Sequence, residues 1–369
     1  MLTTQQVLTL WLCTNENTQA VRRLVESGAT YEQIVVMRRN DLAHIGLPYA
    51  AINALSDVER AVERCDSQFA LAAAYDARVV SLWDDGYPPL LREAFNAPAV
   101  LFMQGTCESS DVDPIAIVGT RGATTYGRLA AERYGHECAS VGVTVVSGLA
   151  RGIDTCAHLA ALEAGGRTFA VVASGLDMIS PSSAARLSER IIHNGCVMSE
   201  KPFGVRALAA FFPQRNRIIS GIAKGIIVIE SDVEGGAMIT ANFASDQNRE
   251  VFALPGPTTS PKSRGTNLLV RTDRARLTQT PTDVLVGLNY IAADTNGTMA
   301  RFNIAQLSMF EQQIIEALGE EPLHIDELSE ATGITTSEML VNLLQLEFKG
   351  LARQMAGKMF LRTLSAPKR

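Results

Sequence analysis

Short apolar runs alternate with stretches of helical periodicity through the middle of the chain. The apolar runs predict strands at Ile115–Gly119, Val143–Ser147, Thr168–Ala173, Cys196–Ser199, Gly225–Glu230 and Glu250–Leu254. The stretches between them predict helices at Tyr126–Ser140, Asp154–Ala164, Ala184–His193, Asn216–Ile222 and Gly236–Asn248. Strands that are apolar along their whole length must be covered on both faces, and the intervening helices supply parallel crossovers. The sequence therefore predicts an α/β fold with a doubly wound, mostly parallel sheet.

The segment before this alternation is predicted to be a small helical module. Residues 1–66 contain short amphipathic stretches, and Gly46-Leu47-Pro48 interrupts one of them as a turn between two helices would. This order is typical of an all-α SAM-like or helix-hairpin-helix module. Residues 67–110 are expected to lead into the α/β domain, which spans 67–286.

The segment after the α/β domain has a different pattern. Residues 287–304 lack sustained periodicity and are predicted to be a linker to a last domain at 305–369. In that domain three helices precede a hairpin that turns at Gly357-Lys358, which is the winged-helix order. The third helix is predicted over Ser337–Phe348, and one of its faces carries Leu340, Leu343, Leu344 and Phe348.

Cysteine spacing and hydropathy bound the environment of the protein. The six cysteines are Cys13, Cys65, Cys107, Cys138, Cys156 and Cys196. They form neither a CxxC pair nor the clustered spacing of a zinc site, so free thiols and no metal are expected. The first 37 residues lack a basic flank followed by a long apolar run, and no stretch approaches the roughly 18 apolar residues of a membrane span. We therefore expect a cytoplasmic protein without a membrane partner.

The distribution of charge favours an anion site in the second half of the α/β domain. The formal net charge of the chain is -6, which by itself argues against a polyanionic ligand. However, residues 111–280 carry 18 Lys and Arg against 15 Asp and Glu, whereas both flanking segments are net acidic. The stretch from Lys201 to Arg276 alone has 11 basic and 6 acidic residues.

Glycine-rich loops follow the predicted strands, where ligands of parallel α/β sheets gather. Glycine lets the backbone approach an anion, a helix start offers unpaired N–H groups, and arginine adds a fork of donors for phosphate. The sequence leaves open a buried ion pair for Arg215 or Arg217, helix capping for Asp154 and simple packing for His158. The candidate binding residues in these loops are Gly119, Thr120, Arg121, Ser147, Gly148, Arg151, Ser174, Gly175, Arg215, Asn216, Arg217, Gly235 and Gly236.

The order of these loops resembles one known family. The strings SGLARGID, from Ser147 to Asp154, and RNRIISG, from Arg215 to Gly221, together with the lead-in Tyr87-Pro88-Pro89-Leu90-Leu91, are similar to the DprA (Smf) family. The resemblance covers roughly residues 85–280, and residues 305–362 resemble the winged helix of that family.

The resemblance implies a Rossmann-like domain that binds single-stranded DNA without strong sequence preference. It also implies that the protein protects incoming strands in natural transformation, passes them to the RecA recombinase and forms a homodimer through the Rossmann-like domain. The family's DNA contact in the first loop corresponds to Arg121, and Arg151, Arg215 and Arg217 match further motif positions. The chain departs from the family where Ser180, Pro181, Ser182 and Ala184 replace a Tyr-Pro segment that can include a DNA-facing lysine; Arg186 is a candidate substitute.

Two alternatives to a non-enzymatic strand binder remain at this point. One is a nucleotide-cleaving hydrolase of the lysine-decarboxylase-like group, with Glu230 and Glu234 beside Gly235-Gly236. The other is a regulator that reads duplex DNA through the winged helix, although the predicted recognition helix carries Glu338 and Glu347. The chain contains no P-loop, HExxH or GxSxG motif, so neither a catalytic residue nor a cofactor is predicted.

Overall fold

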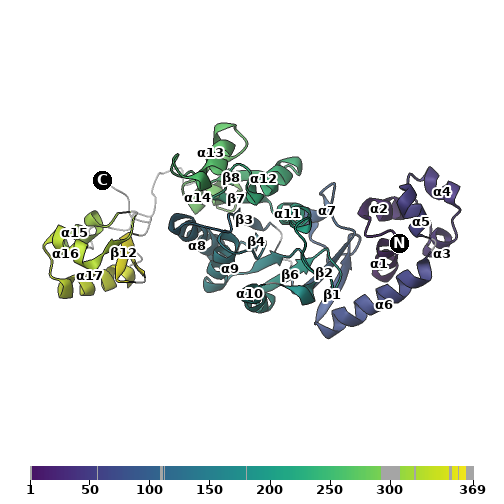
Figure 1. The fold of residues 1–369 in the computed structure, drawn as a ribbon, viewed down its shortest axis with the longest axis horizontal. Coiled ribbons are helices and arrows are strands. Elements are labelled where there is room, and N and C mark those ends of the chain that lie inside the picture. The colour runs from purple at the N-terminus through teal and green to yellow at the C-terminus, as the bar shows by residue number, and fades with distance from the viewer. Residues whose placement is uncertain are drawn as a thin grey trace. The chain divides into compact units, whose positions relative to one another are not determined.

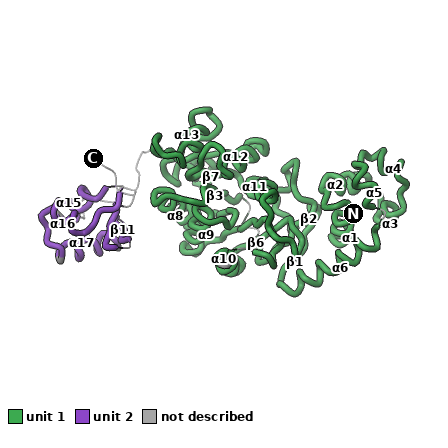
Figure 2. Tube along the Cα trace, viewed as in Figure 1, with its two compact units in different colours: residues 1–292 green, residues 293–369 purple. Residues whose placement is uncertain are grey.

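The structure is a computed structural model of the chain. It describes residues 2–55, 57–108, 111, 113–179, 181–291, 308–319, 321–348, 351–355 and 357–362. Residues 1–292 form one compact unit and residues 293–369 form another (Figure 2). The first unit contains the N-terminal helices and the α/β sheet, and the second contains the C-terminal helices and hairpin (Figure 1).

A nine-stranded sheet forms the centre of the described part of the first unit. Its strands are β1 (Ala77–Ser81), β2 (Val100–Gly105), β3 (Ile115–Gly119), β4 (Val145–Ser147), β5 (Thr168–Val171), β6 (Gly195–Ser199), β7 (Gly225–Ile229), β8 (Glu250–Ala253) and β9 (Arg276–Leu277). Their order across the sheet is β1-β2-β6-β5-β4-β3-β7-β8-β9. The strands from β6 to β9 in this order pair in parallel, whereas β2 is antiparallel to both β1 and β6. The chain winds outward from β3 in one direction and from β7 in the other, which confirms the predicted doubly wound sheet.

Helices cover both faces of this sheet. They are α7 (Pro89–Arg92), α8 (Thr125–Ser140), α9 (Ile153–Glu163), α10 (Ser182–His193), α11 (Phe211–Ile222), α12 (Gly236–Asp246), α13 (Arg264–Arg271) and α14 (Pro281–Gly287), with 3₁₀ turns η1 (Leu176–Met178) and η2 (Pro261–Ser263). Alternate strand residues face opposite layers. In β3, Ile115 and Ile117 share a core with α8, α9 and α14, while Ala116 and Val118 share one with α11 and α12.

The predicted strands are all present, and the main differences lie at element ends and in the lead-in. The antiparallel strands β1 and β2 and the short β9 were not predicted. The helix expected at Asn216–Ile222 begins earlier, at Phe211, and includes Pro213 in its first turn. Proline is tolerated there because the first N–H groups of a helix have no partner within the helix. As a result, Phe212 and Arg215 project from a helix rather than from a loop.

The N-terminal helices pack as part of the first unit. They are α1 (Thr4–Cys13), α2 (Thr18–Glu26), α3 (Tyr31–Val35), α4 (Arg39–His44), α5 (Tyr49–Ala54) and α6 (Val58–Ala74). Their core, which includes Leu8 and Trp11, is continuous with Phe102 of β2 and Ile191 of α10. The boundary expected at residue 66 falls inside α6, which continues to Ala74 and leads into β1. The predicted turn at Gly46 separates α4 from α5 and has a φ of +81°.

The second unit has the order of a winged helix. Helices α15 (Met309–Ala317), α16 (Ile325–Thr332) and α17 (Thr336–Phe348) accompany a sheet of β10 (Leu323–His324), β12 (Met359–Arg362) and β11 (Ala352–Met355). Of the predicted linker, residues 287–291 lie in the first unit, where Leu288 is buried; the rest lies outside the described residues.

The buried face of α17 differs from the predicted one. Met339, Leu343 and Leu346 are fully buried, whereas Leu340 and Leu344 are 46% and 53% exposed. Of the side chains predicted to share a face, Leu343 faces the core, while that of Phe348 lies outside the described residues. The sequence pattern alone could not separate these faces because leucines occur all around the helix.

The structure records all six cysteines as free; Cys107 and Cys156 are half-buried and the other four are buried. Within the described residues, no group of three or more His, Cys, Asp or Glu side chains is arranged to hold a metal ion. In the same part of the chain, no helix combines the length and the hydropathy needed to cross a bilayer.

Candidate nucleic-acid interface

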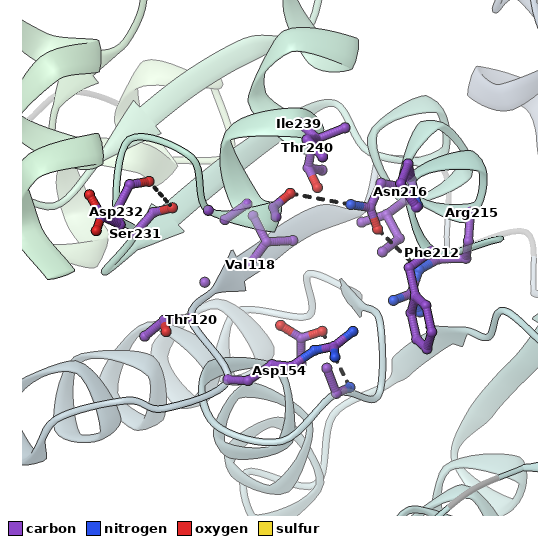
Figure 3. Close-up of a pocket in the computed structure, with 18 residues that line it drawn as sticks. Val118, Thr120, Asp154, Phe212, Arg215, Asn216, Ser231, Asp232, Ile239 and Thr240 are labelled. Atoms are coloured by element: carbon purple, nitrogen blue, oxygen red, sulfur yellow. Dashed lines mark hydrogen bonds between the residues drawn. The ribbon is translucent and has the colours of Figure 1, made fainter. Parts of the chain in front are cut away.

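The loops at the carboxyl ends of β3, β4 and β7 meet where the winding of the sheet reverses, since β3 lies between β4 and β7. Ligands of open α/β sheets bind at such a crevice. Two adjoining cavities of about 350 Å³ and about 560 Å³ occupy this place, and Figure 3 shows the first of them. We refer to the two together as the rim groove. Both are lined by Arg121, Ala150, Phe212 and Arg215.

Arg121 is an exposed cation between the two cavities. Its guanidinium carbon lies 4.7 Å from the centroid of the Phe212 ring, a distance at which a cation and an aromatic face attract each other. This contact holds the guanidinium beside the ring, while Arg121 as a whole stays exposed. A planar fork of donors suits a phosphate better than the point charge of a lysine does.

The loop that carries Arg121 is held against β7. The Thr120 N–H donates to the carbonyl of Glu230 at 2.8 Å, and the Glu230 carboxylate accepts the N–H of Thr124 at 2.8 Å and the Thr124 hydroxyl. At Gly119, a Cβ atom would lie 1.9 Å from the carbonyl oxygen of Ile229, so only glycine lets the chain pass here. The sheet therefore fixes the backbone from which Arg121 projects.

Asp154 holds the second loop. Its carboxylate accepts the N–H of Gly148 at 3.1 Å and that of Ala150 at 3.4 Å. Burial raises the pKa of this carboxyl, and the nearby Arg215 opposes the rise. The capping residue of α9 is Gly152 rather than Asp154, which corrects the sequence prediction; Gly152 has a φ of +83°, and a Cβ there would lie 2.4 Å from the carbonyl oxygen of Thr120. The first and second loops are thus packed directly on each other.

The buried side chain of Arg215 supports the loops of the rim groove. It is 6% exposed and donates to the carbonyl of Gly148 at 2.6 Å and to the carbonyl of Val171. Burial lowers its pKa to about 10, and Asp154 opposes that shift. The Asn216 side chain accepts the Nε–H of Arg215 at 3.2 Å and donates to the carbonyl of Gly236 at 3.3 Å. Because Arg215 donates its hydrogen bonds to backbone carbonyls, its main effects are to hold the loops of the rim groove in place and to add positive potential there.

The start of α12 closes the far side of the first cavity. Gly235 caps this helix, and Gly235 and Gly236 both line the cavity together with Ser231 and Asp232. Helix starts present N–H groups and a partial positive charge to anions. The rim groove therefore combines the exposed guanidinium groups of Arg121 and Arg151, the buried guanidinium of Arg215 and a helix start around a recess.

Comparison with known proteins decides the family. The profile of the DNA recombination-mediator protein A family matches residues 78–289, and that of the DprA winged helix domain matches residues 300–358. The chain belongs to the DprA family.

Members of the DprA family are similar over most of the chain. Protein Smf of Escherichia coli is 35% identical over 72% of this chain and 72% of its own length. DNA processing protein DprA of Streptococcus pneumoniae is 38% identical over 57% of this chain and 74% of its own length. The X-ray structure of DprA from Streptococcus pneumoniae superposes with a TM-score of 0.66 at 32% identity, covering 77% of this chain and 98% of that one. A structure of DprA from Helicobacter pylori, whose report describes a single-stranded DNA binding mode, superposes with a TM-score of 0.53 at 25% identity. The superposition covers 58% of this chain and 97% of that one.

Three of the residues predicted from the DprA motifs lie outside the rim groove. Ser147 is fully buried and donates its hydroxyl to the carbonyl of Ile117 at 2.6 Å. Gly175 packs on Pro202, where a Cβ would lie 2.5 Å from the carbonyl oxygen. Arg217 lines a different cavity and is paired with Glu200 at 2.5 Å. The prediction that Arg215 and Arg217 share one groove is therefore corrected.

The other DprA motif residues meet around the rim groove. Gly119, Thr120, Asn216, Gly235 and Gly236 line the first cavity. Gly148, Arg151 and Ser174 line the second, and Arg151 is exposed. Where the chain departs from the family, Pro181 lines the second cavity, Ser180 and the side chain of Ser182 lie outside the described residues, and the exposed Arg186 lines neither cavity.

Sequence reasoning did not single out two side chains that matter here. The Phe212 ring supports Arg121 and lines both cavities. Lys262 donates its ammonium to the carbonyl of Gly122 and so adds a cation beside the first loop. The aromatic directly before two arginines was the available signal for Phe212. Nothing local pointed to Lys262, which comes from a turn 140 residues further along.

Two residues that an enzyme could use, Glu230 and His158, are engaged in contacts within the fold. Glu230, the proposed acid of the hydrolase alternative, is 4% exposed and is bonded to Thr124 rather than turned into the groove. His158 is fully buried, and its Nδ1 lies 2.6 Å from the Thr168 hydroxyl. Burial, with a contribution from Arg215, lowers the pKa of His158 to about 3, so the imidazole is neutral.

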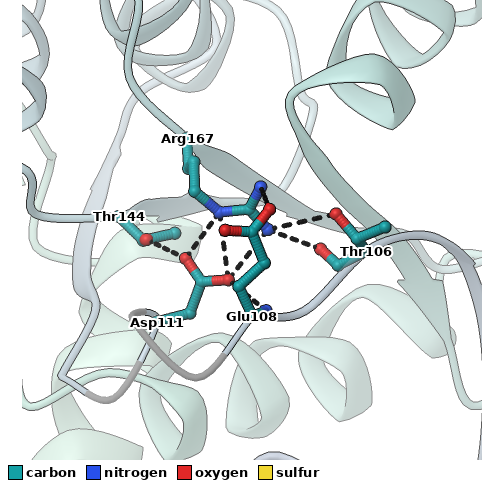
Figure 4. A network of polar contacts seen from close by, with 5 residues as sticks. All are labelled: Thr106, Glu108, Asp111, Thr144 and Arg167. Atoms are coloured by element: carbon teal, nitrogen blue, oxygen red, sulfur yellow. Dashed lines mark hydrogen bonds and ion pairs between the residues drawn. The ribbon is translucent and has the colours of Figure 1, made fainter.

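A second polar network lies at the opposite edge of the sheet, before the strands begin (Figure 4). Arg167 precedes β5 and donates to both carboxylate oxygens of Asp111 at 2.8–3.1 Å, to Glu108 at 2.7 Å and to the carbonyl of Thr106 at 2.7 Å. Asp111 also accepts the hydroxyl of Thr144. Because these groups satisfy one another's hydrogen bonds, we interpret the network as structural: it fixes the connection between β2 and β3 to the start of β5.

Proposed function

We propose that this chain binds single-stranded DNA in the rim groove and that it does so without catalysis. The observation that carries the proposal is the exposed guanidinium of Arg121, held on Phe212 between two cavities and flanked by the start of α12. A flexible strand can place successive phosphates at such donors and stack a base on an aromatic or guanidinium plane. Family membership and the strand-binding mode described for the Helicobacter pylori relative support the assignment.

A duplex is the less suitable ligand. The helix α17, which would enter a major groove in a winged-helix reader, has no Lys or Arg between Thr336 and Phe348. Its exposed face carries Leu340, Val341 and Leu344 beside Glu338. An apolar and acidic face without a cation is unfavourable for phosphates. We therefore expect the intact chain to prefer oligo-dT over a random duplex.

The cellular role in this proposal follows from the family. We propose that the bound strand is incoming DNA in natural transformation, which the protein protects and passes to the RecA recombinase, and that the protein acts as a homodimer through its Rossmann-like domain. The support is membership of the family described as DNA recombination-mediator proteins. A pull-down of RecA by the oligo-dT-bound protein, together with the mass of the protein in solution, tests these two partners.

Arg121→Ala should weaken binding of oligo-dT by roughly tenfold or more, because a charge-assisted contact to phosphate is lost. The slope of log affinity against log salt should also flatten by about 0.7, the value for one phosphate contact on a single strand. Fluorescence anisotropy with labelled oligo-dT at several salt concentrations measures both quantities.

Arg133→Ala is the matched control for this variant. Arg133 lies on α8, pairs with Glu137 at 2.9 Å and lines neither cavity of the rim groove. Its removal should leave both the affinity and the salt slope unchanged. If Arg121→Ala behaves like Arg133→Ala, the rim groove is not the binding site.

A further inference from the structure

A third cavity, of about 440 Å³, lies between the N-terminal helices and α11 within the first unit. From the N-terminal side it is lined by Trp11, by residues 15–17 of the loop after α1 and by Thr18 and Gln19 at the start of α2. From the sheet side it is lined by Asn96, Glu200, Lys201, Gln214 and Arg217. We refer to it as the amide cavity. Its volume falls within the roughly 300–1,000 Å³ of small-molecule sites.

The first turns of α11 separate the amide cavity from the rim groove. Phe212 and Arg215 line the rim groove, whereas Gln214 and Arg217 line the amide cavity. The two faces differ because neighbouring positions on a helix point in different directions, while positions three apart share a face. A single strand that crosses the start of α11 would therefore meet both recesses.

Trp11 lacks a hydrogen-bond acceptor. The indole is 1% exposed, and its buried Nε1–H has no partner among the described residues. A buried donor without an acceptor costs about 1–3 kcal/mol, so most such groups in proteins are paired. Trp11 also lines the cavity, so its indole lies beside any ligand held there.

Every charged side chain that lines the amide cavity is paired with an opposite charge. Glu16 lies 3.2 Å from Lys201, and Glu200 lies 2.5 Å from Arg217. An anion such as a phosphate would find no uncompensated cation here, in contrast to the rim groove with its exposed Arg121. The charges therefore favour a neutral ligand.

The remaining polar groups are mostly amides. The cavity is lined by Asn15, Asn17, Gln19, Asn96, Gln214 and Thr18. The side-chain oxygens of Asn17, Thr18 and Asn96 also accept hydrogen bonds from Ala20, Ala99 and Gln247. An amide offers a donor and an acceptor side by side, which matches the edge of a nucleobase. Single-stranded nucleic acid can turn out a base toward such groups because its bases are unpaired.

We propose that the amide cavity is a base subsite, which takes a nucleobase of the strand whose phosphates lie in the rim groove. This inference rests on the proposed function, because the strand must first be bound beside Arg121. It adds a contact to bases that involves the N-terminal helices, and this contact is independent of phosphate charge.

Trp11 itself provides a direct readout. The chain has two tryptophans, and the other, Trp83, lines neither the amide cavity nor the rim groove. In the Trp83→Phe protein, oligo-dT should change the emission of Trp11 in a saturable way. In the Trp11→Phe protein, the emission of Trp83 should stay constant over the same titration. An oligo-dT in which every base is replaced by an abasic site should leave Trp11 unchanged.

Gln214→Ala tests the same subsite by affinity. Gln214 is exposed, and glutamine and alanine both favour helix, so the variant should fold. We expect about fivefold weaker binding of oligo-dT, because one neutral hydrogen bond is lost. The slope of log affinity against log salt should stay unchanged, because no phosphate contact is lost. The difference from the wild type should vanish with the abasic oligonucleotide. Gln345→Ala, an exposed glutamine of α17, is the control and should bind like the wild type.

The outcomes separate this inference from the proposed function. If Arg121→Ala weakens binding while Gln214→Ala does not and Trp11 emission is constant, the base subsite is refuted and the rim groove stands. If Arg121→Ala binds normally, the proposed function fails. A Trp11 response that persists with the abasic oligonucleotide also overturns the subsite, because it would report a conformational change instead of a base.

Discussion

Arg167→Ala should lower the free energy of unfolding of the first unit by about 3 kcal/mol, the lower end of the cost of removing one partner from a buried ion pair, because Asp111 is buried and Arg167 is partly exposed. The Asp111 side chain is 2% exposed and that of Arg167 is 22% exposed, and three of the donated hydrogen bonds join this pair. Without Arg167 the carboxylate stays buried, and among the described residues only the Thr144 hydroxyl and the N–H of Glu108 donate to it. Its desolvation would then be largely uncompensated.

Urea denaturation followed by tryptophan fluorescence measures this loss. Both tryptophans lie in the first unit, so the signal reports that unit and not the winged helix. Arg133→Ala removes a half-exposed pair on one helix and should cost no more than about 0.5 kcal/mol. Equal losses in the two variants would show that the network in Figure 4 contributes no more than a surface pair does.

The first unit should also lose stability as the pH falls below about 6.5, with His158 responsible for roughly 2 kcal/mol between pH 6.5 and pH 5. The folded-state pKa of His158 is about 3, below its ordinary value of 6.5, because of burial and the nearby Arg215. Between these two values the unfolded chain binds the proton and the folded one does not, so acid favours unfolding. The buried Nε2 atom, which has no partner among the described residues, explains why the charged form is disfavoured.

The control for this prediction is His158→Gln, which keeps a polar group near Thr168 and cannot take up a proton. Asp154 has a raised pKa and therefore contributes in the opposite direction, but it does so equally in both proteins. The slope of unfolding free energy against pH should be shallower in the variant over this range. Parallel slopes would mean that His158 has the same pKa in the folded and the unfolded protein, and the assignment of a buried neutral imidazole would then be wrong.

Much of the sheet could be predicted because its strands are apolar along their whole length. Burial on both faces leaves little alternative to a parallel sheet for runs such as Ile115–Gly119 and Gly225–Ile229. The antiparallel strands β1 and β2 were missed, since the segment between them contains several prolines and a short helix that mask the pattern. The exposed leucines of α17 were misplaced for a related reason, because an apolar residue in the sequence does not reveal which neighbour will cover it.

The arrangement of the proposed binding site could be predicted only in outline. The glycine turns and Arg121 were recognisable because their chemistry is local: a backbone that must pass close to another strand requires glycine, as at Gly119. Arg215 and Arg217 stood together in the sequence, but positions two apart on a helix point away from each other. Arg215 is buried and supports the rim groove, whereas Arg217 pairs with Glu200 in a different cavity.

The sequence by itself determined the fold class, the family and the edge of the sheet at which we propose that a ligand binds, because these depend on periodicity and on short motifs. The tertiary structure alone decided which side chains meet there. Phe212 under Arg121, Lys262 beside Gly122 and Trp11 next to α11 come from distant segments. Such contacts arise from packing between elements, and a local pattern carries no information about that packing.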